Sequence, residues 1–339
     1  MAGNSNLHMS QAGKQDEFYT QLSTIEDELR HYRKYFRDKI VFCNCDDPAI
    51  GEDGENHYGD GLGGYTSNFF RFFHLNFQQL GIKKLITTHY EPNKTSYKFE
   101  IIRNNDGEQL GLPEYIKTEL HGDGDFRSPE CLDLLKACDI VVTNPPFSLM
   151  KEYLPLLIES GKQFLVLGNM NHALYTEIFR YIFEKKVWLG YNSGHFWFMV
   201  PNYYEPKRTD YKEDESGQKW RRLGNICWFT NMDIEKRHEP LELYKKYTPD
   251  EYPTLDNFDA VFCREYSLIP YDTDKIIRVP LTYLAHHCDE QFEILGKLDG
   301  GSPNNPLDLA KPILNGKAQY KGLAIRNKNP KKEGDKDEN

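Results

Sequence analysis

Residues 139–147 read DIVVTNPPF, a short run of branched apolar side chains that ends in a polar residue, two prolines and an aromatic ring. Such a run is typical of a strand buried in a parallel sheet. Proline has no backbone N–H to donate to a strand ladder, so the two prolines mark the end of the strand. The stretch therefore predicts a buried strand that ends at Asn144.

Similar short apolar runs recur along the first half of the chain and alternate with helical patterns. Strands are expected over 39–45, 84–90, 139–143, 163–169 and 225–230, and helices over 27–36, 69–77, 129–137, 149–160 and 173–183. The acidic residues 26–28 are interpreted as the N-terminus of the first helix. Strands that alternate with helices favour an α/β fold with a doubly wound, mostly parallel sheet.

Polar residues stand where these strands end. Asp46 and Asp47 follow the first strand, Glu91 follows the second, and Asn144 follows 139–143. Ligands of doubly wound sheets bind beyond the carboxyl ends of the strands, so we expect these side chains to share one site.

The chain has 339 residues, enough for a large α/β domain with an appended region. The strand and helix pattern fades after residue 232, and residues beyond 326 are charged without an apolar anchor. We therefore expect an α/β domain over 1–232, a distinct C-terminal region over 233–325, and a disordered tail over 326–339.

Composition narrows the class of protein. No apolar run approaches the roughly 20 residues that span a bilayer, and the N-terminus lacks a signal-peptide core, so a cytoplasmic protein without membrane contact is expected. The seven cysteines are odd in number and irregularly spaced, which argues against a disulfide framework. Cys43-x-Cys45 and 286–288 (HHC) lack a second pair at zinc-site spacing, so no metal is expected.

The formal net charge of -10 is unusual for a protein that binds nucleic acid. Local clusters matter more than the total, and basic residues gather at 207–208, 219–222 and 236–237. Each cluster can also be read as ordinary solvated charge.

The sequence Asn144-Pro145-Pro146-Phe147 suits chemistry on a planar amino group. The lone pair of such a nitrogen is delocalised, so a catalyst must draw the nitrogen toward tetrahedral geometry with hydrogen-bond acceptors. Asn144 offers a side-chain carbonyl, and Pro145 a backbone carbonyl fixed in direction by the restricted φ of the prolines. Phe147 can stack on a base that has left the double helix. The alternative is that the prolines only terminate a strand.

In these motifs the chain resembles the EcoRI-type family of adenine-specific DNA methyltransferases, over most of its length. The residues that carry the resemblance are 16–20 (DEFYT), 43–48 (CNCDDP), 67–70 (SNFF), 144–147 (NPPF), 279–283 (VPLTY) and 291–296 (QFEILG). The resemblance implies a Rossmann-like sheet, S-adenosylmethionine as methyl donor, and transfer to adenine N6 in double-stranded DNA. A genetically linked restriction endonuclease is a possible partner.

The resemblance also implies a donor site. Phe18, Tyr19 and Thr20 are expected to border the methionine part, with Asp46 and Asp47 at the end of the first strand. Glu91 is placed to accept hydrogen bonds from the ribose, as acidic residues do in nucleotide-binding α/β folds. Asp125 and Phe126 are expected beside the donor adenine. A surface glutamate and a simple acidic turn are the alternative interpretations.

Two features of the expected site stay open. The chain lacks a regular Asp-x-Phe-x-Gly-x-Gly after the first strand, which leaves Gly61, Gly63 and Gly64 as candidates for the donor loop. Residues 196–198 (FWF) are candidates for a second wall of the base pocket, although core packing is the alternative for each.

Other functions fit parts of the pattern. A methyltransferase acting on protein glutamine or on RNA adenine could use the same NPPF site, and a DNA-binding module could keep the fold without the donor site. A nicotinamide oxidoreductase is disfavoured because no Gly-x-Gly-x-x-Gly follows the first strand.

Overall fold

The computed structural model describes residues 18–46, 67–104, 112–201 and 203–331. The chain forms two compact units. The first comprises Met1–Asn169 and Gly190–Met232, and the second comprises Met170–Leu189 and Asp233–Asn339. No described helix is both long and apolar enough to cross a membrane.

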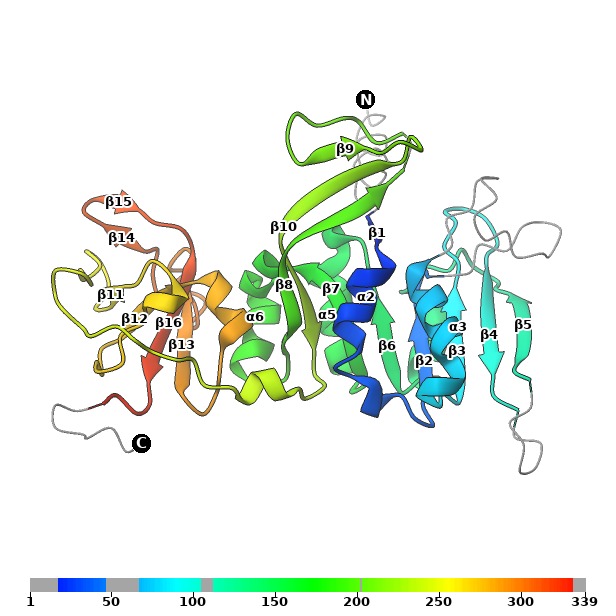
Figure 1. Cartoon of the computed structure of the whole chain (residues 1–339), viewed down its shortest axis with the longest axis horizontal. Coiled ribbons are helices and arrows are strands. Elements are labelled where there is room, and N and C mark those ends of the chain that lie inside the picture. The colour runs from blue at the N-terminus through cyan, green and yellow to red at the C-terminus, as the bar shows by residue number, and fades with distance from the viewer. Residues whose placement is uncertain (1–17, 47–66, 105–111, 202, 332–339) are drawn as a thin grey trace. The chain divides into compact units, whose positions relative to one another are not determined.

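The first unit is built on a large mixed sheet (Figure 1). Its order is β1-β8-β10-β7-β6-β2-β3-β4-β5, with β9 paired to β10. The described strands are β1 (Tyr19–Thr20), β2 (Ile40–Cys43), β3 (Lys84–Thr88), β4 (Tyr97–Ile102), β5 (Glu114–Glu119), β6 (Ile140–Thr143), β7 (Gln163–Asn169), β8 (Trp188–Val200), β9 (Tyr211–Glu213) and β10 (Lys219–Thr230).

Only the centre of this sheet is parallel. Strand β2 pairs in parallel with β3 and β6, and β6 pairs in parallel with β7. Strands β4 and β10 run antiparallel to β3 and β7. The sequence predicts a mostly parallel sheet. The sheet is instead mixed, with parallel pairs at its centre and the antiparallel pairs β3–β4 and β7–β10 on either side.

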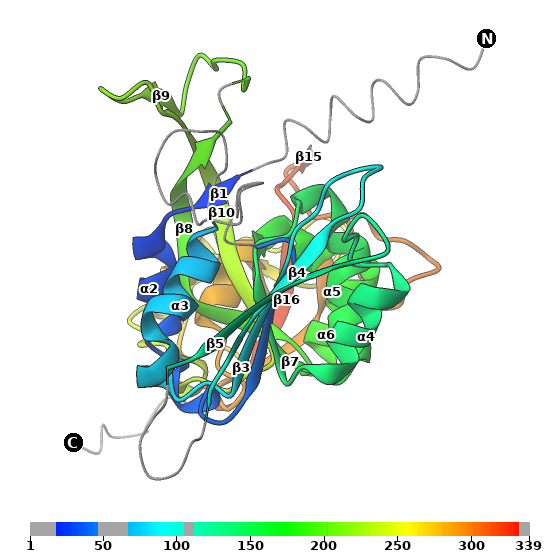
Figure 2. The ribbon, with the colours of Figure 1, turned by 90° about the vertical axis from the view of Figure 1, so that its right-hand side faces the viewer.

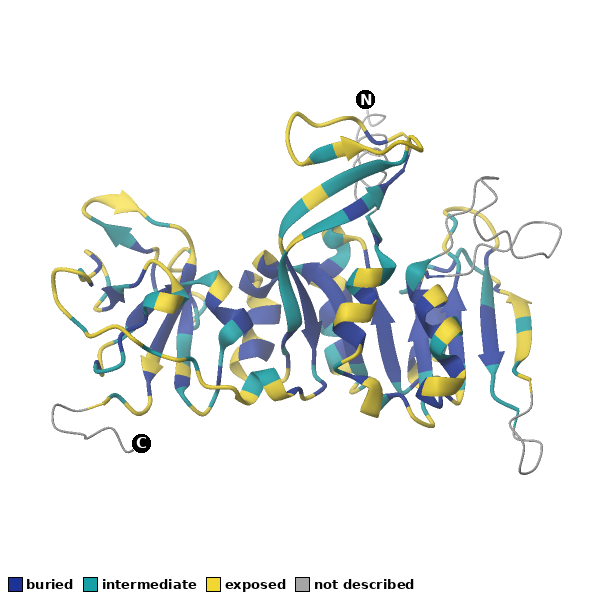
Figure 3. Cartoon of the chain, in the orientation of Figure 1, coloured by how far each residue is buried: buried dark blue, intermediate teal, exposed yellow. Residues whose placement is uncertain are grey.

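The strand directions gather five strand ends on one edge. Strand β5 is antiparallel to β4, which is antiparallel to β3, so β5 runs in the direction of β2, β3, β6 and β7. We call the edge where these five strands end the carboxyl edge. The central strands are buried, as Figure 3 shows, because helices cover both faces of the sheet.

Helices α2 (Leu22–Leu29) and α3 (Asn68–Leu80) lie on one face, and α4 (Pro129–Ala137) and α5 (Met150–Glu159) lie on the other (Figure 2). Ser67 and Ser128 cap α3 and α4 by accepting hydrogen bonds from backbone N–H groups of the first turn. Five phenylalanines of α3 are buried, so this helix brings large apolar surface to the sheet.

The expected helix over 27–36 is wrong. Helix α2 starts at Leu22, and residues beyond it form only the short 3-10 turn η1 (Arg33–Tyr35). Glu28 lies in the last turn of α2 and is fully buried, where it accepts hydrogen bonds from the backbone N–H groups of Tyr191 and Asn192 at 2.7 Å each. This carboxylate therefore joins α2 to β8 and does not mark a helix N-terminus.

The second unit contains α6 (Thr176–Phe183) and a four-stranded sheet of order β11-β12-β16-β13. The described strands of this unit are β11 (Val261–Phe262), β12 (Ile277–Pro280), β13 (Phe292–Leu298), β14 (Ile313–Leu314), β15 (Lys317–Ala318) and β16 (Gly322–Asn327), of which β14 and β15 pair separately. Besides η1, the described residues of the whole chain form the 3-10 turns η2 (Phe147–Leu149), η3 (Met170–Leu174), η4 (Glu235–His238), η5 (Tyr266–Leu268) and η6 (Leu281–His286). Residues 326 and 327, which were predicted to belong to a disordered tail, lie in strand β16.

Candidate functional site

Asn144 lies at the carboxyl edge, directly after β6. Its Nδ2 donates a hydrogen bond to the Phe18 carbonyl oxygen at 2.5 Å. Its Oδ1 is buried and has no hydrogen-bond partner in the described structure. Because Phe18 offers only an acceptor, this contact requires the amide nitrogen to face Phe18. The amide oxygen is therefore the side that is left available as an acceptor.

The ring of Phe18, whose carbonyl oxygen binds this amide, belongs to a group of aromatic side chains. The ring of Phe147 stacks on that of Phe18, with centroids 5.8 Å apart and planes 30° apart. Phe198 meets both rings edge-on, at 5.8 Å from Phe18 and 6.5 Å from Phe147. Tyr204 contacts Phe18 at 6.3 Å. We call Phe18, Phe147, Phe198 and Tyr204 the aromatic cluster.

Strand β1 is held in place from two sides of the fold. Tyr19 and Thr20 pair with Met199 and Phe198 of β8, and Asn68 of α3 donates to the Thr20 carbonyl oxygen at 2.8 Å. The hydroxyl oxygen of Thr20 is buried without a hydrogen-bond partner in the described structure. Asn68 and Tyr204 were not predicted as site residues.

Asp46 is buried after the end of β2, and both of its carboxylate oxygens accept hydrogen bonds. Ser67 at the start of α3 and Thr143 at the end of β6 each donate a hydroxyl at 2.6 Å. The carboxylate therefore ties together the loop after β2, the start of α3 and the strand that carries Asn144. Sequence reasoning missed Thr143, because an apolar strand gives no sign that its last hydroxyl points across to β2.

Gly124 connects the loops at the carboxyl edge. Its φ is +83°, and a Cβ at this position would lie 1.9 Å from the His89 carbonyl oxygen. The Cys45 and Cys131 thiols lie 3.9 Å and 3.4 Å from the Gly124 carbonyl oxygen. Only glycine allows the loop before α4 to approach the ends of β2 and β3 this closely.

Glu91 stands beside this loop. Its backbone N–H donates to the Asp123 carbonyl oxygen at 3.0 Å, and its carboxylate pairs with Lys94 and lies 3.5 Å from His89 Nε2. The hydrogen bond from Lys94 holds the pKa of Glu91 below its usual value. The side chain is 42% exposed, so an ionised carboxylate faces solvent at the edge.

Asp125 and Phe126 are engaged with their own neighbours. Arg127 donates to both carboxylate oxygens of Asp125, at 2.9 and 2.7 Å, and these bonds lower the pKa of Asp125. The ring of Phe126 packs edge-on against buried Tyr153, with centroids 4.9 Å apart. The structure thus places both residues at the carboxyl edge, with Asp125 held in an ion pair.

Other predicted residues are scattered or lie outside the described structure. Of residues 196–198, only Phe198 is fully buried and belongs to the aromatic cluster. Asp47, Gly61, Gly63 and Gly64 lie outside the described residues.

Metal-ligating side chains are dispersed over the fold. The described residues hold no group of three or more His, Cys, Asp or Glu side chains arranged for a metal ion. All seven cysteines are free thiols.

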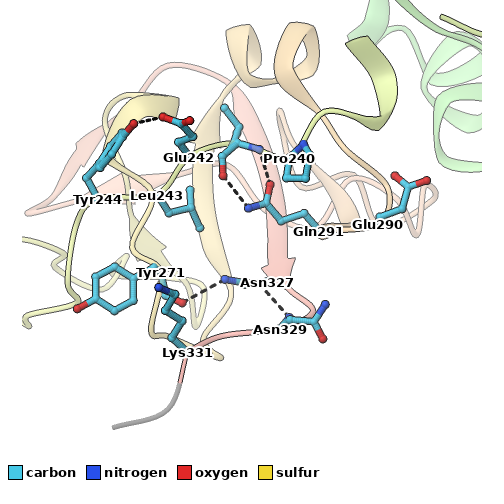
Figure 4. Close-up of a pocket in the computed structure, with 11 residues that line it drawn as sticks. Pro240, Glu242, Leu243, Tyr244, Tyr271, Glu290, Gln291, Asn327, Asn329 and Lys331 are labelled. Atoms are coloured by element: carbon cyan, nitrogen blue, oxygen red, sulfur yellow. Dashed lines mark hydrogen bonds between the residues drawn. The ribbon is translucent and has the colours of Figure 1, made fainter. Parts of the chain in front are cut away.

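A pocket of about 620 Å³ lies in the second unit (Figure 4). Its lining includes Leu241, Tyr244, Tyr271, Gln291 and Lys331. The Gln291 side chain pairs with the backbone of Leu241, donating at 2.8 Å and accepting at 2.7 Å. The Gln291 amide is therefore engaged by the backbone of the pocket wall. None of the residues that line the pocket is a predicted catalytic or donor-binding residue.

Comparison with known proteins identifies a family and several relatives. The family described as "Adenine-specific methyltransferase EcoRI" matches residues 6–339. The Escherichia coli protein "Type II methyltransferase M.EcoRI" is 40% identical over 96% of this chain and 98% of its own length. "Type II methyltransferase M.MgeORF184P" of Mycoplasma genitalium is 34% identical over 95% of this chain and 98% of its own length.

A second mycoplasma protein, "Type II methyltransferase M.MpnI" of Mycoplasma pneumoniae, is 36% identical over 90% of this chain and 89% of its own length. No solved structure matches the chain. The family match spans nearly the whole sequence and includes the Asn-Pro-Pro-Phe segment at the end of β6, so this chain belongs to the EcoRI family of adenine-specific methyltransferases.

Proposed function

We propose that this enzyme transfers a methyl group from S-adenosylmethionine to the exocyclic N6 of an adenine flipped out of duplex DNA. The observation that carries the proposal is the side chain of Asn144. Its amide nitrogen is bound to the Phe18 carbonyl, while its amide oxygen is buried and free to accept. A buried acceptor without a donor is costly, and an amino group of the substrate would satisfy it.

The prolines supply the second acceptor. The Pro146 carbonyl oxygen already accepts from the Leu149 N–H at 2.9 Å, in the turn η2. We therefore assign the Pro145 carbonyl, which precedes it, to the second N6 proton. Two fixed acceptors draw the nitrogen lone pair out of the ring, and this preorganisation acts without a strongly basic side chain.

Phe147 would present its ring to the flipped adenine. The Phe147 ring is stacked on Phe18 and lies edge-on to Phe198. These two contacts would hold it in place. Unstacking a base from duplex DNA costs a few kcal/mol, and stacking on an aromatic ring worth about 1–3 kcal/mol offsets part of that.

The residues at the carboxyl edge fit the methyl donor. Thr20 has a buried hydroxyl without a partner in the described structure, and it follows Phe18 and Tyr19, which are predicted to border the methionine part of the donor. Glu91 keeps an ionised carboxylate at a strand end, suited to ribose hydroxyls. Asp46 would act by positioning, because its oxygens bind Ser67 and Thr143. When bound, the donor supplies an electrophilic methyl group.

We extend the proposal to the whole chain. The parallel order β3-β2-β6-β7 with helices on both faces supports a Rossmann-like donor fold over residues 1–232. The region 233–325 is proposed to recognise the target sequence, and it lies in the second compact unit, which comprises Met170–Leu189 and Asp233–Asn339. A genetically linked restriction endonuclease stays a prediction, which the neighbouring genes would test.

The proposal is tested by offering four substrates in parallel. The purified chain is incubated with methyl-labelled S-adenosylmethionine and either unmodified duplex DNA, the same duplex already N6-methylated, a folded RNA, or a glutamine-containing protein. We expect label only in the unmodified duplex. Label in the RNA or the protein, with none in the duplex, would contradict the proposal.

A further inference from the structure

A three-stranded projection extends from the sheet beyond the carboxyl edge. Strand β10 pairs with β7 only from Ile226 to Thr230, and Ile226 faces Asn169, where β7 ends. The preceding residues of β10, 219–225, therefore continue past the carboxyl edge for roughly 23 Å at about 3.3 Å per residue. Figures 1 and 2 show β8, β9 and β10 standing out from the sheet together on the side of β1. We call residues 195–201 and 203–225 the wing.

The segment of the wing that follows β8 is joined to the aromatic cluster. Tyr204 is 5% exposed and contacts Phe18, and its carbonyl oxygen accepts a hydrogen bond from Lys219 Nζ at 3.0 Å. The side chain of Gln218 donates to the Val200 carbonyl oxygen at 3.0 Å. The wing is thus fixed beside Asn144 by contacts within a single unit.

Cation–π contacts and hydrogen bonds connect the segments of the wing to one another. Lys212 Nζ lies 4.7 Å from the ring of Trp197 and 5.5 Å from that of Trp220, between two strands. The indole N–H of Trp220 donates to Asp214 at 2.8 Å. Arg221 donates to the Asp210 carbonyl oxygen at 2.9 Å. Lys212 and Arg221 are therefore engaged in contacts within the wing.

Three other cations of the wing point outward. Lys207, Arg208 and Arg222 are exposed, and we call them the basic shoulder. Lys207 Nζ lies 5.8 Å from the ring centre of Tyr204, a member of the aromatic cluster. The backbone N–H of Arg222 donates to the Asp210 carbonyl oxygen at 2.8 Å, while its guanidinium reaches the Asp210 carboxylate only at 4.0 Å. The shoulder keeps most of its charge free for a ligand.

The acidic residues of the wing fall into two groups, of which Glu205 and Asp210 lie in the segment that carries Lys207 and Arg208. The other group is Glu213, which ends β9, with Asp214 and Glu215, which follow it. The Asp214 carboxylate is bound by Ser216, Trp220 and the backbone of Gln218, and the first of these bonds contributes most to lowering its pKa to about 2. The Asp214 carboxylate is therefore engaged by its own neighbours within the wing.

In the remaining predicted basic cluster, 236–237, the charge of the arginine is already paired. Arg237 forms ion pairs with Asp233 and Asp289 at 3.2 and 2.9 Å, and its guanidinium stacks on Trp188 at 3.9 Å. This arginine is consumed by contacts inside the second unit.

We propose that the basic shoulder binds phosphates of the DNA duplex beside the target adenine and so holds the duplex over Asn144. The inference rests on the proposed function and names the surface through which the substrate is held. A phosphate backbone passing the carboxyl edge meets the shoulder next to Tyr204. Each neutralised phosphate releases condensed counterions, so this contact has a measurable dependence on salt.

The test compares two triple variants. K207Q/R208Q/R222Q removes the shoulder, and K34Q/K83Q/K136Q removes the same charge from exposed residues near the amino-terminal ends of β2, β3 and β6. Duplex affinity is measured at several salt concentrations by fluorescence anisotropy. For the shoulder variant, the slope of log K against log salt should fall by about 0.9 for each phosphate that is no longer neutralised. The control variant should keep the wild-type slope, and both should bind S-adenosylmethionine as wild type does.

An unchanged slope in a folded shoulder variant would overturn the inference, and so would an equal drop in the control. If the shoulder variant lost affinity for duplex RNA, measured in the same way, but kept its affinity for duplex DNA, the inference would also be overturned. The single variant R208Q, expected to lower the slope by about 0.9, guards against a folding defect in the triple variant. Failure of the proposed function is distinct, because then wild-type protein would not methylate DNA at all.

Discussion

Replacing Asn144 by alanine removes the free amide oxygen and the bond to Phe18 in one step. The hydrogen bond that is removed contributes about 1 kcal/mol to stability, so the variant should still fold. The missing acceptor acts on the reacting nitrogen. Removal of one preorganised group of this kind costs about 10²–10³-fold in rate, or about 2.7–4 kcal/mol. We expect Asn144→Ala to lose methyl transfer on that scale and to keep its affinity for the donor within a few-fold.

The assay is single-turnover methyl transfer with saturating enzyme, followed by calorimetric measurement of donor binding. Asn304→Ala, in an exposed loop of the second unit, is the matched control and should transfer at the wild-type rate. A fall of less than tenfold for Asn144→Ala would refute the role of the amide. An equal fall in donor affinity would place Asn144 in the donor site instead.

Three further changes should have defined effects. Gly124→Ala drives a Cβ into the His89 carbonyl and should lower the free energy of unfolding by about 1–3 kcal/mol, measured by urea denaturation; wild-type stability would argue against the close approach of these loops. Asp46→Asn keeps only one of the two acceptor oxygens that bind the Ser67 and Thr143 hydroxyls and should cost about 1–3 kcal/mol in the same measurement, whereas a fall in donor affinity alone would point to direct donor contact. Hydrogen bonds that the His238 imidazole donates to carboxylates, chiefly to Glu290 and then to Asp233, raise the pKa of His238 above 6.5. Its contribution to stability is therefore complete below pH 6.5 and is lost as the pH rises through the folded value. Because the side chain is 45% exposed, this loss should be less than about 1 kcal/mol, and His238→Gln should abolish the pH dependence; a variant that keeps it would exclude His238 as the source.

The central strands of the sheet could be predicted from the sequence, because each is a compact apolar run that ends in a polar residue. Strand β7 matches its prediction at both ends, and helix α4 does so too. In both segments the local pattern and the packing favour the same structure.

Elements whose local pattern is weak could not be predicted. Strand β5 reads EYIKTE and is largely exposed, so no apolar run reveals it. Strands β11 and β12 span two and four residues, too few to show a period. Glu28 was misread because an acidic residue near a helix end resembles a terminal charge, whereas its partners on β8 lie more than 160 residues away.

The same division holds for the site. The Asn-Pro-Pro-Phe segment is visible in the sequence because its chemistry is local. The contact that orients Asn144 joins it to Phe18, 126 residues earlier, and the contact that fixes β6 joins Thr143 to Asp46. Such long-range pairs depend on strand order, which local patterns do not specify.

The central claim is tested most directly by the atom that receives the methyl group. Duplex DNA is treated with the chain and S-adenosylmethionine that carries a trideuterated methyl group, then digested and analysed as nucleosides by mass spectrometry. The account predicts that the heavy methyl group is found in N6-methyladenine alone. Heavy label in N4-methylcytosine or 5-methylcytosine instead would contradict it.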